Sequence, residues 1–217
     1  MFIGHYGFAF AAKIAARAVP LWVFFVAVQW VDVLWAILVL AGVEKLRIVP
    51  GFTEGSALDL YYMPITHSLP GAILLSLLFG AIVALFVAER RAAVLGIVAA
   101  ASFSHWLLDL LVHVPDLALY DDTAKVGFGL WRDLSLSLPL ELALLIGGAW
   151  LYARAVPSAS SRGVIAFWAF VAFMIAVQLY TSFGPAPAPD TDAFAQTALV
   201  AYSVLAFLAF VVERLRR

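Results

Sequence analysis

Five ionisable side chains lie in otherwise apolar parts of this sequence, where they could bind a metal ion or carry protons. They are Asp32, His67, His105, Asp109 and His113. Three of them, His105, Asp109 and His113, follow one another at four-residue steps, so in a helix they share one face. The chain has no cysteine, so a metal site must use imidazole and carboxylate ligands. Ionisable groups within a membrane are usually paired, metal-bound or part of an ion path.

The His105–Asp109 pair suits two ligands of one metal ion, and it also suits a structural pair in which the carboxylate orients the imidazole. His67 lies in the run Pro64-Ile-Thr-His-Ser-Leu-Pro70. A Ser or Thr cap and a proline in the first turn predict a helix N-terminus there. The positive end of the helix dipole favours a neutral imidazole, as a metal ligand requires, and the alternative is an interfacial histidine in a loop.

The other candidates are isolated along the sequence. Asp32 is surrounded by apolar residues, so a metal ion or a histidine partner is the favoured explanation and a proton relay is the alternative. His5 could be a ligand, a residue that supports one, or an interfacial group. His113 extends the stripe of His105 by two turns, and it is either a proton shuttle or a solvent-exposed helix end. We take His5 and His113 as the candidates for proton transfer.

The composition is that of an integral membrane protein. The chain of 217 residues is 65% hydrophobic and 12% charged, whereas soluble domains have about 25% charged residues. Seven apolar segments are evident, and all but the first reach the roughly 20 residues that a membrane-spanning helix needs. They cover residues 2–17, 20–43, 66–88, 92–112, 132–154, 163–183 and 192–212. We therefore predict an all-α bundle of six or seven transmembrane helices.

Positive charges predict the orientation of this bundle. If the helices alternate in direction, nine basic residues fall on one side, which the positive-inside rule makes cytoplasmic, together with the C-terminus. These residues are Lys13, Arg17, Arg90, Arg91, Arg154, Arg162, Arg214, Arg216 and Arg217. The long loops 44–65 and 113–131 then lie outside. The candidate site residues gather in the outer half of the membrane, which predicts a single site formed by several helices.

The chain divides into two parts by the distribution of these polar residues. Residues 1–155 carry all the candidate site residues, and residues 156–217 form a helical hairpin that we expect to be supporting. The net charge of −1 and the absence of a basic aromatic patch give no reason to expect a nucleic-acid partner.

Four short motifs resemble a known family. They are Gly4-His5, the region of Asp32, Thr66-His67-Ser68 and Ser104-His105-Trp-Leu-Leu-Asp109. In this order they are similar to the YdjM-like, inner-membrane-associated, metal-dependent hydrolases, over about residues 1–155. The sequence departs from that family at Tyr61-Tyr-Met-Pro-Ile65, where a His-Arg pair often precedes the Thr-His-Ser motif.

The order Asp, His, His-x-x-x-Asp also resembles the first zinc site of zinc-dependent phospholipases C. This resemblance implies that Asp32, His67, His105 and Asp109 are four ligands of one divalent metal ion, Zn²⁺ in the first instance. The expected function is a metal-dependent hydrolase in the bacterial inner membrane, acting on a membrane lipid or a phosphoester. The alternatives are a proton- or ion-coupled transporter and a non-catalytic scaffold stapled by a metal ion.

Overall fold

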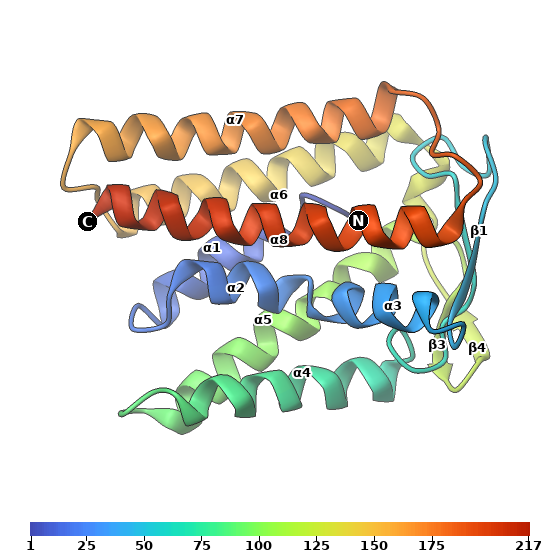
Figure 1. Cartoon of the computed structure of the whole chain (residues 1–217), viewed down its shortest axis with the longest axis horizontal. Helices are drawn as coiled ribbons and strands as arrows, with labels where there is room; N and C mark the ends of the chain where they lie inside the picture. Colours follow the sequence, from blue (N-terminus) through green and yellow to red (C-terminus); the bar gives the residue numbers. More distant parts are fainter.

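The computed structural model describes all residues, 1–217, as a bundle of eight α-helices with two small β-hairpins at one end (Figure 1). The helices are α1 (His5–Ala15), α2 (Leu21–Val28), α3 (Trp30–Leu40), α4 (Leu69–Leu85), α5 (Arg91–Val112), α6 (Leu134–Ala155), α7 (Ser161–Phe183) and α8 (Thr191–Arg216). The predicted all-α class is confirmed.

Four helices, α5 to α8, are long and apolar enough to cross a membrane. The α2–α3 pair makes a fifth span if it is counted as one, although its two helices meet at an angle of 54°. The predicted helix over 20–43 is therefore broken, at Gln29. Helix α4 is apolar but has only 17 residues, and α1 has 11.

Nine of the 13 Lys and Arg residues belong to the α1–α2, α4–α5 and α6–α7 turns, to the helix ends beside them or to the C-terminus, which lie at one end of the bundle (Figure 1). Lys13 is buried there against Glu213, with 2.8 Å between Nζ and Oε1, and Arg17 donates to the Ala155 carbonyl oxygen. This arrangement agrees with the charge asymmetry that the sequence predicts.

The opposite end carries the two hairpins, which form where the sequence suggests only irregular loops. Strands β1 (Lys45–Ile48) and β2 (Leu58–Tyr62) pair antiparallel, as do β3 (Leu117–Tyr120) and β4 (Thr123–Val126). The hairpins bury leucines against the aromatic residues of the nearby helices. They cover the end of the bundle near which the candidate site residues lie.

Helix α1 is held deep in the bundle by a close crossing with α6. A Cβ atom on Gly7 would lie 2.2 Å from the Leu144 carbonyl oxygen, and one on Gly148 would lie 2.3 Å from the Gly7 oxygen. Only glycine allows the two backbones to approach this closely. The segment before α1 is fixed by Glu141, whose Oε2 accepts from Phe2 N at 2.9 Å and Gly4 N at 3.3 Å. These contacts place His5 at the centre of the molecule.

Candidate metal centre

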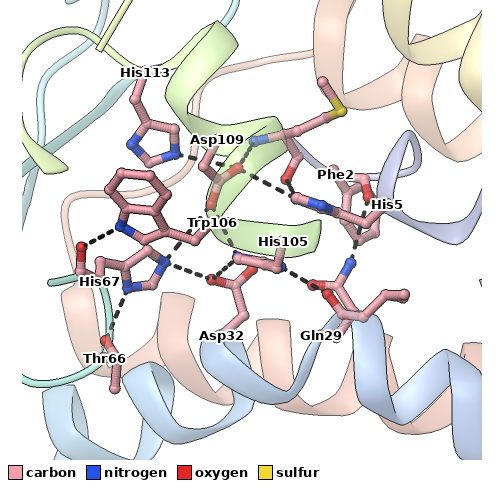
Figure 2. Close-up of polar contacts among 12 residues, drawn as sticks. Phe2, His5, Gln29, Asp32, Thr66, His67, His105, Trp106, Asp109 and His113 are labelled. Carbon is pink, nitrogen blue, oxygen red and sulfur yellow. Dashed lines mark hydrogen bonds and ion pairs between the residues drawn. The ribbon is translucent and has the colours of Figure 1, made fainter. Parts of the chain in front are cut away.

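The four predicted ligands converge from three helices (Figure 2). Asp32 is in the first turn of α3, and His67 directly precedes the N-cap of α4. His105 and Asp109 lie one turn apart on α5. The predicted helix start at residues 66–70 is confirmed, because Ser68 caps α4 and accepts from Gly71 N.

Two overlapping groups of three donor atoms are close enough to hold a metal ion: Asp32, His67 and His105, and His5, His105 and Asp109. Asp32 Oδ1 lies 3.3 Å from both His67 Nε2 and His105 Nε2. Asp109 Oδ2 lies 2.9 Å from His105 Nε2 and 3.8 Å from His67 Nε2. Neighbouring ligands of a tetrahedral zinc ion, each about 2.0–2.1 Å from the metal, lie roughly 3.3 Å apart. Two of the four distances equal this value, one is shorter and one is longer.

The break between α2 and α3 sets the tautomer of His105. Val28 ends α2, and its carbonyl oxygen lies 2.7 Å from His105 Nδ1. A carbonyl oxygen can only accept, so Nδ1 carries the donated proton. In the neutral imidazole, Nε2 then presents a lone pair towards the two carboxylates.

A chain of hydrogen bonds sets the tautomer of His67 in the same way. The Thr66 hydroxyl donates to Glu44 Oε2 at 2.6 Å, so it accepts from His67 Nδ1 at 2.8 Å. Glu44 also accepts from the backbone N–H groups of Ile65 and Thr66. The Trp106 indole N–H fixes the His67 carbonyl oxygen at 2.9 Å. His67 Nε2 is thereby the free nitrogen, as a ligand requires.

The crowding of these donor atoms calls for a cation between them. Imidazole lone pairs and carboxylate oxygens repel one another unless a proton or a metal ion lies between them. His105 Nε2 is buried and makes no hydrogen bond, although Asp109 Oδ2 is only 2.9 Å away. The nitrogen is therefore not directed along an ordinary hydrogen bond to this carboxylate. Two imidazoles and two carboxylates are a donor set that fits a divalent metal ion, above all zinc.

The second oxygen of Asp109 faces the two remaining histidines (Figure 2). Asp109 Oδ1 lies 3.2 Å from His5 Nε2, 3.6 Å from His113 Nε2 and 2.7 Å from Met1 N. The His5 ring stacks on the His105 ring at a centroid distance of 4.0 Å. Each oxygen of Asp109 therefore has its own group of partners.

His113 is buried, and its interpretation as a solvent-exposed helix end is wrong. Its exposed fraction is 2%, because the Trp131 ring covers it at a centroid distance of 4.3 Å. Asp116 is also buried and lies 2.9 Å from His113 Nδ1. The carboxylate can only accept from Nδ1, so His113 Nε2 is directed at Asp109.

Sequence reasoning missed three groups that orient the ligands: Glu44, the Val28 carbonyl oxygen and Tyr202. The Tyr202 hydroxyl donates to Asp32 Oδ2 at 2.9 Å, from a helix of the expected supporting hairpin. The only sign of such groups in the sequence is a polar residue next to an apolar run. Gln29, at the break between α2 and α3, does not indicate that the preceding Val28 carbonyl oxygen orients a ligand.

Replacing Thr66 by valine is expected to weaken metal binding by about 10-fold, since supporting hydrogen bonds to ligands typically account for 10–100-fold. Valine keeps the shape of threonine but lacks the hydroxyl that joins His67 Nδ1 to Glu44 Oε2 by hydrogen bonds. The measurement is zinc affinity of the purified protein in competition with a chelating dye. Thr197→Val on α8, where the hydroxyl donates only to its own helix, is the matched control. Equal affinities in both variants would show that Thr66 does not orient the ligand.

Comparison with models of known protein families, with curated proteins and with solved structures found no match to this chain.

Proposed function

We propose that this protein is an integral membrane metal-dependent hydrolase, with six or seven helices in the bilayer and its C-terminus in the cytoplasm. The apolar composition supports a place in the bilayer, and nine basic residues at the turns and C-terminus of one end support this orientation. The centre then lies in the outer half of the membrane. The resemblance to the YdjM-like hydrolases points to the bacterial inner membrane.

One observation carries the proposal: the Nε2 atoms of His67 and His105 each lie 2.9–3.8 Å from a carboxylate oxygen of Asp32 and of Asp109. The Val28 carbonyl oxygen and the Thr66 hydroxyl turn the Nε2 lone pairs of both imidazoles towards this point. Zn²⁺ is the ion that best suits two nitrogen and two oxygen ligands at tetrahedral spacing.

The chemistry proposed is hydrolysis of an ester or phosphoester. A divalent metal ion held by these residues would need a further coordination position for water, since four protein ligands alone make a closed site. With that position open, it would lower the pKa of the water and polarise the group that is cleaved. His113 is oriented by Asp116 and is placed to take up a proton on Nε2. His5 stacks on His105 and is placed to pass a proton at its Nε2 to or from Asp109 Oδ1. A centre at membrane depth favours a lipid or lipid-linked substrate.

The metal content of the purified protein tests this proposal. Wild type purified without chelator, and resupplied with zinc or manganese, is expected to hold stoichiometric metal. His105→Ala is expected to hold none. If wild type holds no metal under these conditions, the hydrolase proposal is wrong and the cluster is a structural ion pair or a proton relay.

The proton-transfer roles predict a separation of binding from turnover. His113→Ala is expected to keep its metal and to lose about 10²–10⁴-fold in hydrolysis rate, the usual contribution of a general acid or base. The rate would be measured on lipid phosphoesters in mixed micelles with metal-replete protein. Metal-replete wild type without hydrolase activity on any ester or phosphoester lipid would instead indicate a metal-stapled scaffold.

A further inference from the structure

Tyr202 is the only side chain of the C-terminal helical hairpin that hydrogen-bonds to a proposed ligand. It lies in the middle of α8, which packs along α2 and α3, and its hydroxyl donates to Asp32 Oδ2 at 2.9 Å. The other carboxylate oxygen, Asp32 Oδ1, faces His67 and His105 at 3.3 Å each. The two oxygens of Asp32 are thus divided between the centre and α8.

This division matters because Asp32 is the least enclosed of the four ligands. Its side chain is 16% exposed, whereas that of Asp109 is 2% exposed. A carboxylate without a partner for its second oxygen can rotate, or can bind a metal ion through both oxygens. Asp109 is held on its second oxygen by His5 and Met1. Asp32 has Tyr202 in the same position.

We propose that Tyr202 is a positioning residue of the metal centre, which holds Asp32 as a ligand through one oxygen only. The inference rests on the proposed metal-dependent function. It adds α8 to the helices that position the metal centre. A phenol suits this role because it donates one hydrogen bond to a carboxylate and remains protonated at neutral pH. The Phe2 ring packs near the tyrosine ring, with 6.3 Å between centroids, so the hydroxyl is held on a supported side chain.

The test is Tyr202→Phe, which removes the hydroxyl and keeps the ring. Zinc affinity, measured in detergent by chelator competition, is expected to fall by about 10–100-fold, the usual effect of losing a partner that orients a ligand. X-ray absorption spectroscopy of the zinc-loaded variant is expected to show one additional oxygen ligand, from the released Asp32. The control is Tyr180→Phe on α7, whose side chain is 67% exposed.

A double-mutant cycle with Asp32→Ala separates positioning from general loss of packing. Without the carboxylate, Tyr202→Phe is expected to cause no further loss of zinc affinity. A further loss, or wild-type affinity and coordination in Tyr202→Phe alone, would overturn the inference. Either of these results would contradict the role of Tyr202 but not the metal centre. A wild-type protein that binds no metal would contradict both the proposed function and this inference.

Discussion

Purified Asp109→Asn protein is expected to contain no stoichiometric metal. Asparagine has nearly the same volume as aspartate but lacks the negative charge, so the centre keeps only one anionic ligand. Asp109 also contacts more of the cluster than any other ligand, with partners on both oxygens. We expect the zinc affinity to fall by more than about 100-fold, the upper end for a supporting partner alone. Elemental analysis of the protein in detergent measures this loss.

The matched control for this variant is Asp192→Asn, an exposed aspartate in the first turn of α8. It should bind metal as wild type does. The helical content of both variants should be compared by circular dichroism, since Asp109 also holds the segment before α1. A folded Asp109→Asn protein with full metal content would show that the four-ligand centre is wrong.

The second large effect is expected at the α1–α6 crossing. In Gly148→Ala the new Cβ would meet the Gly7 carbonyl oxygen at 2.3 Å, a backbone atom that can move only with its helix. The two helices must separate, and we expect the free energy of unfolding to fall by about 1–3 kcal/mol, as for an overpacked core. Metal affinity should fall as well, because α1 carries His5, which contacts the ligand Asp109 at Oδ1.

The neighbouring residue provides the control for this prediction. Gly147 lies beside Gly148 on α6, and a Cβ there would meet no atom within 4 Å. Gly147→Ala should leave stability unchanged or raise it slightly, because alanine favours a helix by up to about 1 kcal/mol over glycine. Thermal unfolding in detergent compares the two. Equal melting temperatures would mean that the crossing is looser than it is in this structure.

Much of the site could be predicted because an ionisable residue in an apolar segment is conspicuous. Asp32, His67, His105 and Asp109 stand out in this way, and the structure brings them within ion-pair distance of one another from α3, α5 and the segment before α4. Their convergence follows from depth, which the order of the helices and the rise per residue determine. The helix N-terminus near His67 followed from its local capping signals.

The parts that could not be predicted depend on tertiary contacts. Tyr202 has the same sequence environment as a tyrosine that faces lipid, and only the packing of α8 against α3 distinguishes it. His113 was placed too near the surface, since the covering Trp131 lies in a loop whose path the sequence does not determine. The bend at Gln29 was missed because a single glutamine in an apolar run is compatible with a continuous helix.

The two proposed histidine ligands differ in how readily a mutation can change their orientation. His67 is oriented by the side chains of Thr66 and Glu44, so a codon change at either position alters it. His105 is oriented by the Val28 carbonyl oxygen, which every amino acid supplies. Substitutions at Val28 that preserve the bend should therefore be tolerated, while those at Thr66 and Glu44 should be selected against. A saturation library scored for function would show this contrast between a main-chain and a side-chain acceptor.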